Sequence, residues 1–515
     1  MIVTAADVRS HLDESCDVVV VGTGAGGAVC AAELQRGGLD VILIEEGAHW
    51  TAEDFTQREG EMHARIDGGR GATTTVDGAM ILSYGRAVGG STVHYWVNAF
   101  RAPAFRMKDW REKAGAEHWS PEEMAPYYAT VEANLNVERV HDYQINRNNQ
   151  ILKDAADRLG WHCEPVTQAR KDCLACSYCM LGCAYNRKQS MLVTYVPWAV
   201  AGGARLFASC RVEGIDTERG SAVGLRARFL DPDTREQLGS LRVRARKGVV
   251  VAAGGLGTPA LLLRSGLANE SGRLGRNLCV NPNLAVAAVM EEEVLHHRNI
   301  PSSYDVTEFQ ATRRDPSGRY LEGGYTFFGA GAQPGFTAAV IPGFGREHRR
   351  RLVELMTHGA ACLSVVDDAP GPGRVTVDAE GRPRFHYEWD EATVAKARDY
   401  FRKAATLYLA AGAREVFLPT NPPTRIRSAA DLAQIDGISF APGRVVVIGS
   451  HLLGTAAMGK DPERSVVSPE GEAHSVKNLW VACGAALPSS VGIDPSLTIS
   501  SHAMRTGQRM LARYG

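Results

Sequence analysis

The sequence predicts an α/β fold whose first domain is a doubly wound, Rossmann-type dinucleotide-binding domain. The apolar run Val18 to Val21 leads directly into the glycine-rich loop Gly22-Thr23-Gly24-Ala25-Gly26-Gly27, and a helix-like segment starts near Ala28. A second apolar run, Asp40 to Ile44, ends at the acidic residue Glu45. Strand, glycine loop, helix, strand and acid in this order are the pattern of a dinucleotide site.

The loop glycines have separate physical tasks. Gly22 permits the tight turn, Gly24 lets the backbone approach a pyrophosphate, and Gly27 allows the helix to pack closely on the strand. The free N–H groups at the helix N-terminus attract the phosphates. Glu45 lies about 20 residues beyond the loop, where a carboxylate accepts both ribose hydroxyls and disfavours a 2′-phosphate.

The composition is that of a globular protein with room for two or more cores, with 515 residues, 44% hydrophobic and 22% charged. The formal net charge of -1 gives no global reason to expect nucleic acid or an anionic membrane as a partner. No stretch approaches the ~20 apolar residues of a membrane span, and the N-terminal segment lacks the features of a signal peptide. We therefore expect a cytoplasmic chain, exported only if a partner subunit carries it.

Apolar runs reappear late in the chain, so the nucleotide-binding domain is predicted to be discontinuous. Val249 to Ala253 and Asn478 to Ala482 suit strands in a parallel sheet. Between them lie strand-like pieces, such as 323–328 and 374–377, and an amphipathic helix from about Asp390 to Ala411. The predicted domains are 1–105, 190–282 and 446–515 for nucleotide binding, 106–189 for a helical, cysteine-bearing insertion, and 283–445 for substrate binding.

Four of the 11 cysteines form a run. Cys173, Cys176, Cys179 and Cys183 follow the C-x2-C-x2-C-x3-C spacing of ferredoxin-type iron-sulfur ligation, with Ala184 where a proline often follows. The spacing leaves four interpretations open: a 3Fe-4S centre, a 4Fe-4S centre, zinc, and no metal. A structural disulfide framework is not expected in a chain without an export signal.

Two further segments complete a resemblance that spans nearly the whole chain. They are Gly85-Arg86-Ala87-Val88-Gly89-Gly90-Ser91-Thr92-Val93-His94 and His451-Leu452-Leu453-Gly454-Thr455-Ala456-Ala457-Met458-Gly459, with 257–266 and 275–278 around them. With the phosphate loop, they resemble the signatures of the glucose-methanol-choline (GMC) family of flavin-dependent alcohol oxidoreductases. The resemblance implies FAD as the dinucleotide, an α+β substrate-binding domain built on an antiparallel sheet, and an alcohol lying over the flavin ring between the domains.

The resemblance also implies which residues meet the flavin. Gly89, Gly90 and Ser91 are small enough for the backbone to pass against the ring and donate N–H groups to its edge. His94 occupies the place where some family members attach FAD covalently through a histidine. A hydrogen bond from a histidine beside a noncovalent flavin is the other interpretation.

One cofactor contact departs from the family pattern. Cys483 stands where relatives commonly have an aspartate near the ribityl chain and pyrophosphate. The backbone N–H groups of Gly484 and Ala485 are expected to serve there, with Cys483 as a small packed residue.

His451 is the candidate catalytic base. It precedes the turn that carries the family base, and an ordinary pKa near 6.5 suits imidazole to taking a proton at neutral pH. The family's usual partner is an asparagine or histidine, whereas here Asp494 takes that place. An ionised aspartate beside a forming alkoxide raises the barrier, whereas a protonated or paired one donates a hydrogen bond or orients His451. His502 is a less favoured second histidine.

These assignments predict oxidation of an alcohol CH–OH group to a carbonyl by hydride transfer to flavin N5. An iron-sulfur centre would pass the electrons to a cytochrome or another acceptor protein, which favours a dehydrogenase. The alternatives are an oxygen-reducing alcohol oxidase with a metal-free cysteine run and a noncatalytic flavin electron-transfer subunit. Sugars, sterols, polyols and aliphatic alcohols all agree with the sequence.

Overall fold

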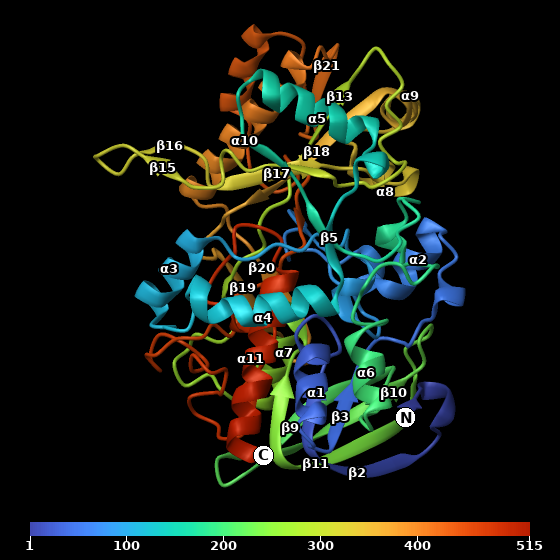
Figure 1. Cartoon of the computed structure of the whole chain (residues 1–515), viewed down its shortest axis with the longest axis vertical. Coiled ribbons are helices and arrows are strands. Elements are labelled where there is room, and N and C mark those ends of the chain that lie inside the picture. Colours follow the sequence, from blue (N-terminus) through green and yellow to red (C-terminus); the bar gives the residue numbers. More distant parts are fainter.

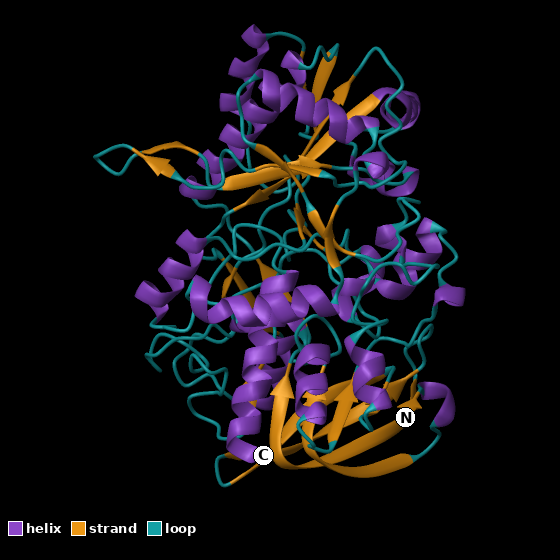
Figure 2. Ribbon diagram, viewed as in Figure 1, coloured by secondary structure: helices purple, strands orange, loops and turns teal.

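Two β-sheets lie at opposite ends of the long axis of the molecule, and both chain termini lie beside the first sheet (Figures 1 and 2). The structure is a computed structural model that describes residues 1–515. No helix combines the length and the apolarity needed to cross a membrane.

The first sheet has eight strands and is mixed. Its strands are β1 (Ile2–Val3), β8 (Arg205–Phe207), β3 (Val41–Ile44), β2 (His11–Val21), β11 (Gln237–Val251), β10 (Ser221–Leu230) and β9 (Cys210–Glu218) in spatial order, with β24 (Leu479–Val481) on β11. The pairs that link β1, β8, β3, β2, β11 and β24 are parallel, whereas β10 is antiparallel to both neighbours. The predicted strand at Val249 to Ala253 is therefore only the end of the long strand β11, whose first part is a hairpin arm.

Helices cover the parallel part of this sheet. Helix α1 (Gly27–Arg36) packs on α11 (Ser496–Tyr514) and on α6 (Tyr195–Ala201), and α7 (Gly254–Ser265) follows β11. The buried strands β2 and β3 read Val-Val-Val-Val and Val-Ile-Leu-Ile at their pairing residues because both faces of the sheet are covered. The predicted strand–loop–helix–strand unit is confirmed.

The second sheet is antiparallel throughout. Its strands are β22 (Thr424–Ile426), β21 (Glu415–Leu418), β13 (Ala285–Val289), β18 (Gly359–Val366), β17 (Tyr325–Gly329), β14 (Tyr304–Val306) and β6 (Cys163–Pro165) in spatial order. Helices α10 (Glu391–Ala410) and α5 (Arg147–Arg158) pack on the sheet and on each other. The expected antiparallel sheet is confirmed, and Asp390 caps α10 by accepting a hydrogen bond from Thr393 N at 2.6 Å.

The other face of the second sheet looks toward the first sheet. Residues of β13 alternate: Val286 and Ala288 join the core under α10, whereas Ala285 and Ala287 line a cavity. Helices α8 (Pro334–Val340) and α9 (Gly345–His358) lie at the edge of this face, where Leu355 packs with Val289. This face is therefore the wall of the site described below.

The remaining elements lie between the two sheets or at their margins. They are α2 (Glu59–Ile66), α3 (Ala104–Ala114), α4 (Pro121–Asn134), β4 (Ile81–Leu82) paired with β23 (Ile448–Gly449), β12 (Arg276–Leu278), β19 (Gly373–Val377), β20 (Pro383–His386), β5 (Val137–Arg139), β7 (Thr167–Ala169), β15 (Arg313–Arg314) and β16 (Tyr320–Glu322). Segment 106–189 serves both layers, since α4 packs on α11 and β6 pairs with β14.

Candidate active site

A cavity of about 610 Å³ lies between the two sheets. It is lined by the glycine-rich phosphate loop and Glu45 from the first layer, by β13, β17 and β18 from the second, and by His451 and Asp494. The chain therefore brings its predicted dinucleotide segments and the His451–Asp494 pair, distant in sequence, to one cavity.

The phosphate loop has the backbone that its glycines predict. Gly22 has φ of +100°, a conformation that favours glycine, and a Cβ at Gly26 or Gly27 would collide with the carbonyl oxygen of Ala482 or Gly22. Gly24, by contrast, meets only Gly90, with 3.7 Å between its ideal Cβ and the Gly90 Cα. The loop is thus packed on its protein side and open toward the cavity, as a pyrophosphate requires.

Glu45 stands at the end of β3, at the cavity wall. Its carboxylate accepts hydrogen bonds from Thr23 N at 3.0 Å, Thr23 Oγ1 at 2.8 Å and Gly47 N at 2.9 Å. Burial raises the pKa of Glu45 to about 7, although these hydrogen bonds oppose the shift. The position expected for a ribose-binding carboxylate is therefore occupied by a fixed and buried acid.

The second glycine segment lies directly against the phosphate loop. Gly89 and Gly90 have φ of +98° and +56°, and a Cβ at Gly90 would lie 2.7 Å from the Cα of Gly24. Gly89 N donates to Thr23 Oγ1 at 3.0 Å, and the Ser91 hydroxyl accepts from Gly85 N at 2.9 Å. Only glycine fits at this contact between the two loops, so small residues are required there as expected.

His94 lines the cavity and is held by a carboxylate that the sequence analysis missed. Asp67 lies between two histidines, 2.9 Å from Nδ1 of His94 and 2.7 Å from Nδ1 of His63. Although burial opposes it, the charge of His94 and the hydrogen bonds of both rings lower the pKa of Asp67 to about 2, and the bond to Asp67 raises the pKa of His63. Because Nδ1 of His94 faces an ionised carboxylate, Nε2 is the ring nitrogen left for the cavity.

His451 and Asp494 form a pair at the cavity. Their Nε2 and Oδ1 atoms lie 3.1 Å apart, and the side chains are only 12% and 17% exposed. His451 Nδ1 and Asp494 Oδ2 are buried without a protein partner. The pair thus has one free nitrogen and one free oxygen for a further hydrogen bond.

His502 takes no part in this pair. It lies in α11, fully buried and stacked on Trp119 at 6.1 Å between ring centroids. Burial lowers its pKa to about 3. It does not line the cavity, so its place in the structure is that of a neutral core residue.

The segment after β24 closes the other side of the dinucleotide site. Gly484 lines the cavity, whereas Ala485 is buried behind it and its carbonyl accepts from Ala456 N at 2.8 Å. The Cys483 sulfur lies 3.4 Å from the Thr258 hydroxyl, and burial raises the pKa of the thiol. Cys483 is a packed residue in the core.

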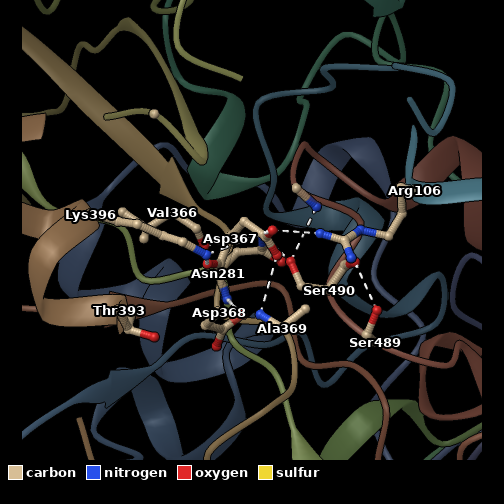
Figure 3. Close-up of polar contacts among 12 residues, drawn as sticks. Arg106, Asn281, Val366, Asp367, Asp368, Ala369, Thr393, Lys396, Ser489 and Ser490 are labelled. Atoms are coloured by element: carbon tan, nitrogen blue, oxygen red, sulfur yellow. Dashed lines mark hydrogen bonds and ion pairs between the residues drawn. The ribbon is translucent and has the colours of Figure 1, made fainter. Parts of the chain in front are cut away.

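Two consecutive aspartates after β18 support the segments that carry His451 and Asp494 (Figure 3). Asp367 binds Arg106 of α3 through Nη2 at 2.5 Å, and Lys396 of α10 donates to its backbone oxygen at 2.5 Å. Burial opposes ionisation, but both cations and a hydrogen bond with Ser490 keep the pKa of Asp367 below its ordinary value. Ser490 Oγ in turn accepts from Gly492 N at 3.1 Å, two residues before Asp494.

Asp368 supports the segment of His451. It accepts a hydrogen bond from Val280 N at 2.8 Å, and the carbonyl of Val280 accepts from His451 N at 3.3 Å. Tyr387 also donates to Asp368, while burial raises the pKa of Asp368 to about 6. The two aspartates therefore hold the segments of His451 and Asp494 from one turn.

A buried acid on the second sheet also belongs to the surroundings of the pair. Asp305 is registered opposite Phe328, which lines the cavity, and opposed residues of antiparallel strands point to the same face. Asp305 is 1% exposed, and neither carboxylate oxygen has a partner with hydrogen-bond geometry. Burial, aided by the charge of Asp494, raises its pKa well above the ordinary value. The sequence could not find Asp305, because its face depends on strand register.

The predicted metal site does not form. All four cysteines of the run are free and half-buried, and the structure gathers no group of three or more His, Cys, Asp or Glu side chains able to hold a metal ion. Lys188 lies against the run and donates to the carbonyl oxygens of Val93 and Cys179. The spacing of the four cysteines is therefore not accompanied by a group of side chains arranged to hold a metal ion.

Where the second sheet and its neighbouring helices line the cavity, a set of apolar side chains forms the wall, called the apolar branch below. Its walls are Ala287, Phe328, Val340, Ile341, Leu355, Ala361, Leu363 and Phe417. These residues come from β13, β17, β18, β21, α8, α9 and the connection after α8. No charged side chain belongs to this set, so the branch suits a hydrocarbon chain or ring.

A Rossmann-type layer whose glycine loops open into a cavity with a histidine–carboxylate pair is the arrangement of a flavin-dependent oxidoreductase. Residues 62–283 and 369–503 match the two models of the GMC oxidoreductase family. The chain belongs to this family, which makes FAD the dinucleotide that the glycine loops serve.

Known relatives agree over most of their length. An uncharacterized GMC-type oxidoreductase of Mycobacterium tuberculosis is 34% identical over 96% of this chain and 76% of its own. A long-chain-alcohol oxidase of Arabidopsis thaliana is 24% identical over 95% of this chain and 67% of its own. A 2-methyl-1,2-propanediol dehydrogenase of Mycolicibacterium austroafricanum is 26% identical over 97% of this chain and 96% of its own.

Solved structures share the fold. Pyridoxine 4-oxidase from Mesorbium loti superposes with a TM-score of 0.72 at 19% identity, covering 96% of this chain and 99% of that one. A formate oxidase from Aspergillus oryzae RIB40, in a structure that concerns FAD modification, superposes with a TM-score of 0.72 at 13% identity. The match covers 98% of this chain and 99% of that one. The two-layer arrangement is thus that of GMC flavoproteins.

Removing Arg106 is expected to destabilise the protein and slow the reaction. Arg106→Met leaves the Asp367 carboxylate buried with Lys396 alone, and breaking a buried ion pair lowers the free energy of unfolding by roughly 3–5 kcal/mol. Urea unfolding measures the loss, and Lys108→Met on the exposed side of α3 is the control. Equal losses of unfolding free energy in the two single variants would contradict the role of the Arg106–Asp367 pair. Partial recovery of that free energy in Arg106→Met/Asp367→Asn would support it.

Asp305→Asn is expected to stabilise the protein at neutral pH. The pKa of Asp305 is higher in the folded protein than in the unfolded chain, where it is about 3.9. The carboxyl group therefore contributes its full stability below about pH 3.9, and this contribution falls as the pH rises toward the folded-state pKa. Asparagine keeps the neutral form and removes this fall. Thermal unfolding should show a higher midpoint for the variant at pH 7.5 and equal midpoints near pH 4. Exposed Asp233→Asn is the control, and a lower midpoint for Asp305→Asn at pH 7.5 would refute the assignment.

Proposed function

We propose that the protein oxidises an alcohol CH–OH group to a carbonyl, with His451 as the base that takes the hydroxyl proton. The observation that carries the proposal is the His451–Asp494 pair, which faces the same cavity as the glycine loops. Bound FAD supplies the hydride acceptor for such a reaction. The protein's own residues must then position the alcohol and receive one proton.

Pairing with His451 compensates the negative charge that Asp494 would otherwise place beside a forming alkoxide. The Asp494 carboxylate lies beside Nε2 of His451, and Nδ1 of the ring has no protein partner, so we propose Nδ1 as the basic nitrogen. When the ring takes the hydroxyl proton, the imidazolium is neutralised by the carboxylate at 3.1 Å. Burial raises the pKa of Asp305 and so favours its neutral form, which limits further negative charge beside the pair.

An iron-sulfur relay, which would favour a dehydrogenase, is not supported by the cysteine run, which forms no metal-ligating group. Relatives named as an oxidase and as a dehydrogenase both match the chain. We propose that the acceptor, dioxygen or an external molecule, takes electrons at the flavin, and aerobic against dye-linked turnover distinguishes the two.

The catalytic pair is tested by two variants. His451→Asn should retain FAD but slow anaerobic flavin bleaching by an alcohol on the order of 100- to 10,000-fold, the usual contribution of a positioned base. Asp494→Asn should retain FAD and change the pH profile of bleaching. His141→Asn, at the surface, is the control. An unchanged rate and pH profile in both variants would sink the assignment, and no bleaching of the wild type by a broad alcohol panel would favour a noncatalytic subunit.

The apolar branch leads us to propose alcohols with an extended apolar body as substrates. Each buried methylene contributes ~0.8 kcal/mol, so kcat/KM should rise about fourfold per carbon in a series of primary alcohols until the branch is full. Ala287→Phe should abolish this dependence and spare short alcohols, whereas Ala339→Phe on the outside of α8 should not. A preference for sugars over long alcohols would overturn the substrate class.

A further inference from the structure

The connection between α8 and α9 joins the wall of the apolar branch to an exposed tip. Ile341 is buried and lines the cavity, whereas Phe344, three residues later, is 90% exposed. Gly343 and Gly345 flank this ring with φ of +117° and +69°, and nothing lies within 4 Å of where their Cβ atoms would be. A large apolar side chain is therefore presented to solvent at the edge of the cavity wall.

Helix α9, which follows the tip, has two different faces. Leu355 points inward and lines the cavity, and Arg351 on the same side pairs with Glu354 and Glu415. The outer stripe consists of Arg346, Arg349, Arg350 and Val353, spaced at i, i+3, i+4 and i+7.

The outer arginines are unpaired. None of Arg346, Arg349 and Arg350 forms an ion pair or a side-chain hydrogen bond with the rest of the chain, and all three are exposed. Val353 between them is 61% exposed. Other charges near α9 are already matched, since Glu347 binds Arg425 at 2.6 Å. The stripe is thus an uncompensated positive surface with apolar side chains in it.

We infer that this surface, Phe344 with the outer stripe of α9, docks the protein on a phospholipid bilayer that contains anionic lipids. A helix with a basic outer face and apolar side chains binds such an interface by combining headgroup attraction with shallow apolar insertion. A protein partner with an acidic surface is the alternative occupant, and the vesicle experiment below separates the two. The net charge of -1 for the whole chain conceals this local surface.

Docking there would bring the bilayer to the apolar branch. Phe336 and Val340 of α8, Ile341 and Leu355 line the cavity and belong to the same stretch, 336–355, as the exposed tip. An apolar alcohol dissolved in the bilayer could then enter beside α8 and α9 without crossing water. This consequence, unlike the docking itself, rests on the proposed function.

The test is sedimentation of the FAD-loaded full chain with vesicles. The protein should pellet with vesicles of equal parts phosphatidylcholine and phosphatidylglycerol, weakly with phosphatidylcholine alone, and less at high salt. Arg346→Glu/Arg349→Glu/Arg350→Glu should lower the partition coefficient on the order of 100-fold or more, because each arginine near the surface contributes about fivefold. Phe344→Ser should weaken binding several-fold. The matched control is Arg111→Glu/Arg273→Glu/Arg374→Glu, which changes the same charge at exposed sites elsewhere.

The outcomes separate docking from catalysis. Three results would overturn the inference: equal binding by the two triple variants, equal binding to both kinds of vesicle, or no binding by the wild type. The last result would favour an acidic protein as the partner of the arginines. If the glutamate variant misfolds, Arg346→Gln/Arg349→Gln/Arg350→Gln gives a milder test. Oxidation of a short, water-soluble alcohol should be unchanged in every variant. Vesicle binding without flavin bleaching by any alcohol would keep the docking surface and reject the proposed function.

Discussion

The structure depends on the turn after β18, where two buried aspartates take opposite tasks. Asp367 is ionised between Arg106 and Lys396, whereas Asp368 binds backbone N–H groups at Val280 and the next residue. Asp367 is connected to the segment of Asp494 through Ser490, and Asp368 is connected to the segment of His451 through Val280. The arginine at this turn comes from α3 and the lysine comes from α10. The turn therefore also connects elements that belong to both layers.

Buried acids around the cavity are handled in three physical ways. Asp67 is neutralised by two histidines and has a pKa of about 2, Glu45 is held by three hydrogen bonds, and Asp305 is left without partners and favours its neutral form. In the proposed oxidation the alcohol gives a proton to the base and a hydride to the flavin, and uncompensated negative charge beside it would oppose alkoxide formation. The charge state of the site is therefore a property of contacts between segments.

The sequence predicted the first layer well because its pattern is local. Glycines at fixed offsets from an apolar strand specify the loop whatever the rest of the chain does, and Asp390 before the amphipathic stretch specified the start of α10. The cysteine run shows the limit of the same reasoning. Its spacing is that of a cluster, yet a metal site also requires the right arrangement of side chains in three dimensions, and the structure gathers no such group.

The sequence by itself determined the dinucleotide loop, the family, and the identity of His451 and Asp494 as the pair to examine. Only the tertiary structure decided that they lie 3.1 Å apart, that Asp67 holds His94, and that Asp305 faces the same wall as Phe328. The physical reason is that a motif constrains the backbone over a few residues, whereas burial, pairing and strand register depend on segments that are not neighbours in the sequence. The apolar branch is likewise visible only once four strands share one face.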